Sequence, residues 1–141
     1  MRIGLLTRYP DCYSSRRLVF ACEEAGHQVV ILDYLRCRMD IAAGNPAVFY
    51  KGEQVFVDAI IPRIAATYTF YGAAVVRQFE MAGVLTANTA LGITQSRDKL
   101  RCHQLLSRKG VAMPVTGFAH DVRDIDALLD SVGGTPAILK L

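Results

Sequence analysis

The 141-residue sequence has no tryptophan, and its apolar runs are all far shorter than the roughly 20 residues that a membrane-spanning helix needs. The first residues, Met1–Arg8, are too short an apolar stretch for a signal peptide and favour a β-strand. These absences exclude a membrane protein and a secreted one, and they predict a cytoplasmic chain without membrane partners.

A strong excess of charge of one sign is also missing. Sixteen basic and 13 acidic residues leave a net charge of +3. Nucleic-acid-binding proteins concentrate basic residues on one face. One basic stripe, predicted on a helix over residues 98–109, contains Arg97, Arg101 and Arg108. A solvated helix face explains it better than phosphate binding, so we expect no direct contact with nucleic acid.

Metal and redox motifs are absent as well. The four cysteines stand at positions 12, 22, 37 and 102, and none forms a Cys-x-x-Cys pair. The three histidines are equally scattered. This spacing predicts free thiols in a reducing compartment and no metal ligands within the chain.

Three familiar phosphate and nucleophile motifs are missing too. The first turn after a predicted strand, Thr7–Ser14, has no glycine, which excludes the dinucleotide-binding fingerprint. The chain contains neither a P-loop nor the Gly-x-Ser-x-Gly elbow of serine hydrolases. Motif patterns alone therefore identify no site.

What the sequence does contain is an alternation of buried strands and amphipathic helices, in a chain that is 52% hydrophobic and 21% charged. Ile3–Thr7, Gln28–Leu32 and Ala59–Ile61 are typical of strands in a parallel sheet. A helix between the first two strands, capped by Ser14 or Ser15, completes a right-handed βαβ unit. We predict an α/β, Rossmann-like domain with helices on both faces of the sheet.

The same kind of pattern predicts the remaining helices and strands. The pattern predicts an irregular segment at 33–45, a hairpin at 48–55, and a helix from Thr69 to about Ala82. After the helix at 98–109 come a strand at 115–118, a helix over 122–132 and a strand at 137–141. We place a boundary within 88–98 and predict a first domain at 1–95 and the start of an α+β domain at 96–141.

Several motifs in this chain resemble the RimK family of ATP-grasp ligases, and the resemblance runs along its whole length. They are Tyr50-Lys51-Gly52, Ile61-Pro62-Arg63-Ile64, Thr69-Phe70-Tyr71-Gly72, Arg77-Gln78-Phe79-Glu80-Met81, Ser96-Arg97-Asp98-Lys99-Leu100, Gly110-Val111, Pro114-Val115-Thr116-Gly117 and Val132-Gly133-Gly134. The resemblance implies a pre-ATP-grasp domain followed by the incomplete start of an ATP-grasp domain.

Members of that family add L-glutamate to the C-terminus of a small-subunit ribosomal protein through an acylphosphate. The resemblance therefore implies ATP, L-glutamate and a ribosomal protein tail as partners, and it leaves room for a homo-oligomer. By position, Lys140 matches a nucleotide-binding lysine and Lys99 a lysine near the phosphates. The surface alternative is an ordinary solvated lysine at each position. Magnesium or manganese is also implied, with ligands beyond residue 141.

Arg63 is a candidate substrate-binding residue because it follows a buried strand at the presumed carboxyl edge of the sheet. Arginine binds a carboxylate through two parallel hydrogen bonds. A salt bridge that stabilises the loop is the alternative. Arg8, at the end of the first strand, is a further candidate of the same kind.

Two interpretations of the whole chain remain open at this stage. In the first, the sequence is the N-terminal part of a ligase, either a fragment or a truncated gene product, and is inactive alone. In the second, it is a stand-alone, non-enzymatic α/β module that binds a small ligand or a partner.

Overall fold

The computed structural model describes residues 1–140. The chain divides into two compact units, Met1–Arg97 and Asp98–Leu141. Each unit is described separately below.

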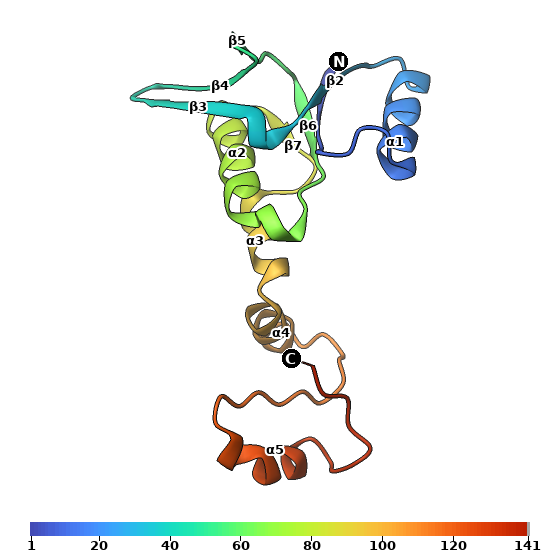
Figure 1. The fold of residues 1–141 in the computed structure, drawn as a ribbon, viewed down its shortest axis with the longest axis vertical. Helices are drawn as coiled ribbons and strands as arrows, with labels where there is room; N and C mark the ends of the chain where they lie inside the picture. Colours follow the sequence, from blue (N-terminus) through green and yellow to red (C-terminus); the bar gives the residue numbers. More distant parts are fainter. Residues whose placement is uncertain (141) are drawn as a thin grey trace. The chain divides into compact units, whose positions relative to one another are not determined.

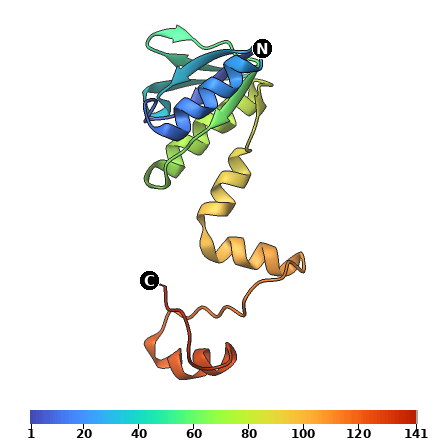
Figure 2. The same cartoon turned by 90° about the vertical axis from the view of Figure 1, so that its right-hand side faces the viewer.

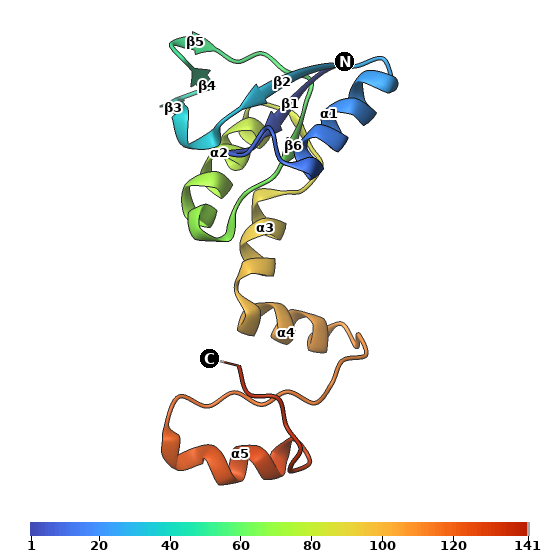
Figure 3. The same cartoon turned by 45° about the vertical axis from the view of Figure 1, so that its right-hand side comes forward.

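A four-stranded parallel sheet forms the centre of the first unit, with strand order β2-β1-β6-β7. Figure 3 labels β2, β1 and β6 of this sheet. Its strands are β1 (Arg2–Leu6), β2 (Gln28–Leu32), β6 (Ala59–Pro62) and β7 (Leu85–Thr86). Ile3 pairs with Val29 on one side and with Ala59 on the other. The apolar run in β1 is buried because this strand lies between two neighbours, as such a run predicts.

Helices cover both faces of this sheet (Figure 1), which confirms the predicted α/β architecture. One face carries α1 (Tyr13–Glu24); the other carries α2 (Thr69–Met81), followed along the chain by α3 (Ala90–Arg97). The predicted capping of α1 by Ser14 or Ser15 is wrong, because the helix already begins at Tyr13. No helix within residues 1–140 has the length and apolar character needed to cross a membrane.

A small antiparallel sheet contains the predicted hairpin and one strand that the sequence analysis missed. It consists of β3 (Cys37–Ala42), β4 (Asn45–Tyr50) and β5 (Glu53–Gln54). Two 3₁₀ turns, η1 (Tyr34–Arg36) and η2 (Ala66–Tyr68), precede β3 and α2. Residues 37–42 of the segment expected to be irregular instead pair with β4, and Cys37 and Met39 pack against the core while Arg38 between them is exposed.

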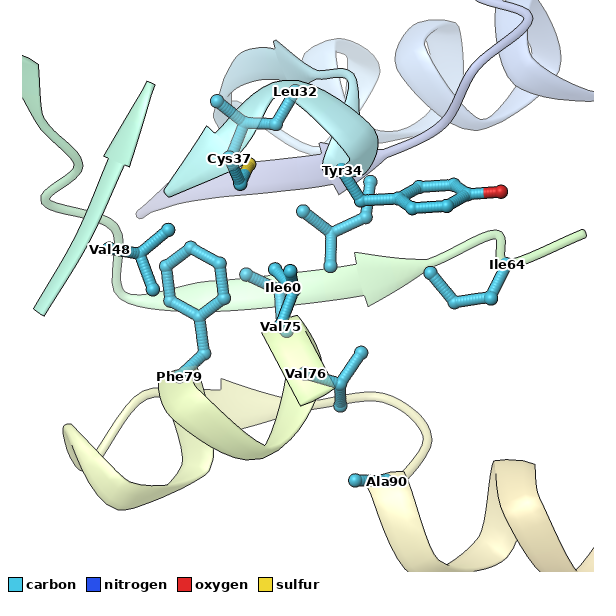
Figure 4. Close-up of a cluster of buried hydrophobic side chains, with 11 residues drawn as sticks. Leu32, Tyr34, Cys37, Val48, Ile60, Ile64, Val75, Val76, Phe79 and Ala90 are labelled. Carbon is cyan, nitrogen blue, oxygen red and sulfur yellow. The ribbon is translucent and has the colours of Figure 1, made fainter. Parts of the chain in front are cut away.

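The core of the first unit lies between the parallel sheet and α2 (Figure 4). Leu6, Leu32 and Ile60 from the sheet meet Val75 and Phe79 from α2, and all five are at most 1% exposed. These side chains fix the sheet against the helix, so the ends of β1 and β6 have defined positions.

The second unit contains α4 (Lys99–Arg108), the turn η3 (Val122–Asp124) and α5 (Ile125–Ser131) (Figure 2). The predicted strand at 115–118 is wrong, and so is the predicted strand at 137–141 as far as residue 140; Leu141 lies outside the described residues. Val115 is 73% exposed and Ile138 is 87% exposed. A β-strand needs a partner for its backbone groups, and neither segment has one within residues 98–140.

Candidate functional site

A cleft of about 790 Å³ opens at the carboxyl edge of the parallel sheet. Thr7, Arg63 and Ala87, which follow β1, β6 and β7, line it. From β1 the chain passes to β2 on one side and later to β6 on the other. Ligands of open α/β sheets bind where the connections diverge in this way. The cleft is therefore the first unit's candidate ligand site.

Arg63 lies where the sequence placed it, at the carboxyl end of a buried strand. Its Nη2 donates a hydrogen bond to Oγ of Ser14, at 2.8 Å. Arg63 is exposed and forms no ion pair with an acidic residue within residues 1–140. The loop-stabilising salt bridge is thus not what the described residues show. The guanidinium group is directed toward a neutral hydroxyl and retains N–H donors for an anion.

A hydroxyl network lies beside Arg63 at the start of α1. Oγ1 of Thr7 and Oγ of Ser15 are 3.2 Å apart, and both side chains are buried. Oγ1 of Thr7 also accepts a hydrogen bond from the backbone N–H of Tyr9 at 3.1 Å. These bonds hold the turn between β1 and α1 in place, and this turn forms the wall of the cleft that Arg63 contacts through Ser14.

Cys12 lies in the same wall and is the N-cap residue of α1. Its Sγ lies 3.5 Å from Oγ of Ser14 and 3.2 Å from Oγ of Ser15. These hydroxyl contacts, with a smaller contribution from the positive charge of Arg63, lower the pKa of the Cys12 thiol to about 7. A substantial fraction of this partly exposed thiol is therefore thiolate near neutral pH.

Arg8 lies near the cleft but takes part in a different set of contacts. Its guanidinium carbon is 4.8 Å from the ring centroid of Tyr68 and 6.0 Å from that of Tyr9. Its Nε lies 4.0 Å from a carboxylate oxygen of Asp33. The described contacts of Arg8 are thus to two rings and a carboxylate of its own unit, in contrast to those of Arg63.

Helix α3 provides another wall of the cleft, through Gly92, Ser96 and Arg97. The prediction that Arg97 continues the basic stripe of the helix at 98–109 is wrong. Asp98 is the N-cap of α4 and its side chain accepts a hydrogen bond from the N–H of Arg101, so Arg97 ends the preceding helix. Nη2 of Arg97 donates to the carbonyl oxygen of Ile64 at 2.6 Å.

Both candidate nucleotide-binding lysines belong to the second unit. Lys99 is the first residue of α4, and Lys140 lies in the irregular segment after α5 rather than on the predicted strand. Both are exposed. Their ammonium groups are therefore accessible to a phosphate. Arg63, the other candidate, belongs to the first unit.

The acidic residues and the other metal-ligand types are scattered over the described part of the chain. Within residues 1–140 no three or more His, Cys, Asp or Glu side chains converge on a point that could hold a metal ion. Magnesium needs several oxygen ligands around one point. The described residues therefore do not fit a magnesium or manganese ion.

Comparison with known families assigns both parts of the chain. Residues 1–93 match the family described as RimK PreATP-grasp domain, and residues 96–141 match the RimK-like ATP-grasp domain. The chain belongs to the RimK family. The resemblance found in the sequence motifs is thereby confirmed, as is the fold that it implied.

Curated relatives extend this result. The chain is 55% identical over 142 aligned residues to a "Probable alpha-L-glutamate ligase 1" of Shewanella sp. strain MR-4. It is 54% identical to a "Probable alpha-L-glutamate ligase" of Vibrio cholerae serotype O1. Each alignment covers 100% of this RimK-family chain and 47% of the relative. The chain thus spans about half the length of the curated relatives it matches.

A solved structure supports the fold independently. The structure titled "ATP-grasp ligase PsnB complexed with minimal precursor" aligns with a TM-score of 0.62 and 16% identity. The alignment covers 94% of this chain and 50% of that one. At this identity the likeness concerns the fold alone.

Sequence reasoning missed two residues of the cleft, Cys12 and Arg97. The cysteine spacing predicts only a free thiol at Cys12, although Ser14 and Ser15 follow it at the start of a helix. The basic stripe places Arg97 on the helix at 98–109 and not at the end of α3. Asp98 is the signal that separates the two helices, since aspartate is a preferred N-cap and a helix that begins after it ends the previous one.

Proposed function

We propose that this chain forms the N-terminal part of an ATP-dependent carboxylate–amine ligase. The proposed reaction adds L-glutamate to the C-terminus of a small-subunit ribosomal protein through an acylphosphate. Membership of the RimK family, over both matched domains, carries this proposal. Relatives named alpha-L-glutamate ligase, aligned along the whole chain, support it. We assign residues 1–95 to the pre-ATP-grasp domain and 96–141 to the ATP-grasp domain.

The proposed chemistry has two steps. A carboxylate oxygen attacks the γ-phosphorus of ATP, and the bond to the bridging oxygen breaks to release ADP. The amine of glutamate then attacks the acyl carbon, loses a proton and displaces phosphate to leave an amide. Because phosphoryl transfer depends mainly on positioning and charge stabilisation, cationic side chains are the residues to test first.

Arg63 is proposed to bind a substrate carboxylate in the cleft. Its position at the diverging connections of the sheet and its uncompensated charge support this role. The hydrogen bond to Ser14 holds one Nη nitrogen, so the side chain is oriented before a ligand arrives. Preorganisation of this kind reduces the entropic cost of binding.

Lys140 and Lys99 are proposed to contact the phosphates of ATP. Both are exposed, and lysine binds phosphate as a point charge. Magnesium or manganese would neutralise phosphate charge in the complete enzyme. Since residues 1–140 hold no cluster suited to a metal, we assign the metal ligands to sequence outside this chain.

The decisive experiment joins residues 1–141 to the C-terminal part of the Shewanella relative. We expect this chimera to release ADP and to transfer labelled glutamate to a peptide that carries a ribosomal protein tail. The 141-residue chain alone should do neither, since it spans about half the length of its relatives. A chimera that folds but never transfers glutamate, or turnover of ATP by the chain alone, would contradict the proposal.

The lysine assignment has a matched control. Lys140→Ala in the chimera should raise the KM for ATP about 10- to 100-fold, the equivalent of a charged hydrogen bond of about 1.5–3 kcal/mol. Lys109→Ala removes an exposed lysine at the end of α4 and should leave KM unchanged. Equal effects of the two substitutions would refute a specific role for Lys140. We also propose a cytoplasmic location and a possible homo-oligomer, and both are to be measured on the chimera.

A further inference from the structure

The segment that carries Arg63 is fixed to the rest of the first unit at several points. The backbone N–H of Arg63 donates to the carbonyl of Leu6 at 2.9 Å. The next carbonyl, of Ile64, accepts from Arg97 at 2.6 Å, and the N–H of Ala65 donates to the hydroxyl of Tyr34 at 3.1 Å. Three consecutive residues after β6 therefore each have a defined partner.

The side chain of Ile64 provides an additional anchor. It is 6% exposed and packs over Gly72 in α2. A Cβ atom at Gly72 would lie 2.3 Å from Cγ2 of Ile64, so the Ile64 side chain occupies the space that any larger residue at position 72 would need. Ile64 is thus held on one side by α2 and on the other by the guanidinium of Arg97.

Arg97 is itself attached to a fixed helix. At the start of α3, Ala90 is 1% exposed and its N–H donates to a carboxylate oxygen of Glu80 at 2.9 Å. Arg97 is the last residue of that helix. The only side-chain bond between the end of α3 and the Arg63 segment that the described residues 1–97 record is the one from Arg97 to Ile64.

We propose that Arg97 is a positioning residue that holds Arg63 in the cleft by binding the carbonyl oxygen of Ile64. The inference rests on the proposed function, in which Arg63 binds the substrate carboxylate. A charged N–H donor to a carbonyl is among the stronger hydrogen bonds of a protein. Displacement of the Ile64 carbonyl rotates the adjoining peptide plane and moves Arg63 away from Ser14.

The thiol of Cys12 reports the position of Arg63 without any substrate. Ser14 contacts both Sγ of Cys12 and Nη2 of Arg63, and the Arg63 charge favours the Cys12 thiolate. The rate of alkylation by iodoacetamide at pH 7, measured for the Cys12 peptide by mass spectrometry, therefore follows the placement of Arg63. The intact 141-residue chain is sufficient for this measurement.

Arg97→Ala should slow alkylation of Cys12 about two- to threefold, close to the effect of Arg63→Ala, because the thiolate fraction falls. Arg97→Lys, which keeps a donor and the charge, should recover part of the rate. Arg101→Ala, in α4, is the matched control and should change nothing. Circular dichroism of each variant verifies that α1 to α3 remain folded.

The double variant Arg97→Ala/Arg63→Ala separates positioning from a direct effect of charge. If Arg97 acts through Arg63, the double variant alkylates no more slowly than Arg63→Ala alone. Multiplicative effects, or an unchanged rate in Arg97→Ala, would overturn the inference. Protection of Cys12 by L-glutamate or by a C-terminal peptide tests the proposed function separately. Absence of protection would count against substrate binding by Arg63, and the alkylation rates of the variants would still decide the role of Arg97.

Discussion

Residues 1–97 and residues 98–140 both contain helices with apolar stripes, but only the first set buries them. In the first unit, Val75 and Phe79 of α2 are at most 1% exposed. In the second, Leu106 of α4 is 39% exposed and Ile125 of α5 is 45% exposed. None of the described residues 98–140 is buried. The difference shows that an apolar stripe predicts a helix, whereas burial requires a second layer facing that stripe.

The largest effect expected from this comparison is in amide hydrogen exchange of the 141-residue chain. Amides of β1 and β6 should exchange at least about a thousandfold more slowly than those of residues 111–140, because core strands open only by global unfolding, which costs about 5–15 kcal/mol. Exchange measured by mass spectrometry resolves the two units. Uniform protection would show that the second unit is as stable as the first.

Truncation of a buried side chain should lower the free energy of unfolding far more than truncation of an exposed one. Phe79→Ala should destabilise the first unit by about 3–5 kcal/mol, since it leaves a cavity between α2 and the sheet. Phe70, on the same helix, is 91% exposed and provides the matched control. Urea denaturation followed by circular dichroism measures both variants, and a similar loss for Phe70→Ala would contradict the described core.

A smaller loss should follow from filling the close contact between α2 and the Arg63 segment. Gly72→Ala places a methyl group 2.3 Å from Cγ2 of Ile64, so the free energy of unfolding should fall by about 1–3 kcal/mol. Gly92→Ala in α3 meets only the Thr89 hydroxyl, at 3.1 Å, and should cost much less. Equal midpoints for the two variants would mean that the α2 contact is looser than described.

The smallest expected effect is in the pH dependence of Cys12 alkylation, compared with that of the buried Cys37. A thiol pKa near 7 means that alkylation of Cys12 rises steeply between about pH 6 and pH 8 and then levels off. Burial raises the pKa of Cys37 to about 12, so Cys37 should remain unmodified over this range. Arg63→Ala should move the Cys12 midpoint upward, because a positive charge near the thiolate is lost. A Cys12 rate profile with its midpoint near the ordinary thiol value of about 8.5 would contradict the described contacts.

Prediction from the sequence succeeded where the local pattern and the tertiary environment agree. The run Ile3–Thr7 is apolar because β1 lies between two strands of a parallel sheet, and Gln28–Leu32 is rich in β-branched residues, so their composition identifies both as strands. Prediction failed for β3. The burial of Cys37 and Met39 on either side of Arg38 depends on packing against the core and on pairing with β4, and neither is evident from the local sequence. Prediction failed again for 115–118, because this segment has no neighbouring strand to pair with among the described residues 98–140.

The candidate site divides in the same way. The position of Arg63 was predictable because, in a parallel sheet, a residue that follows a buried strand lies at the carboxyl edge. Cys12 and Arg97 were not, because their importance depends on neighbours far away in the sequence. Besides the neighbouring hydroxyls, the charge of Arg63, 51 positions later in the sequence, contributes a smaller part to the lowered pKa of Cys12. Arg97 binds a carbonyl 33 positions earlier.

Local periodicity and motifs were sufficient to predict the α/β class, the alternation of strands and helices, and the RimK family. Which polar groups meet at the cleft, and which apolar faces are covered, became known from the three-dimensional arrangement. Hydrogen bonds and packing contacts act over a few ångströms in space and are indifferent to distance along the chain. Arg97, Ile64 and Arg63 therefore form one unit of structure that the linear pattern does not reveal.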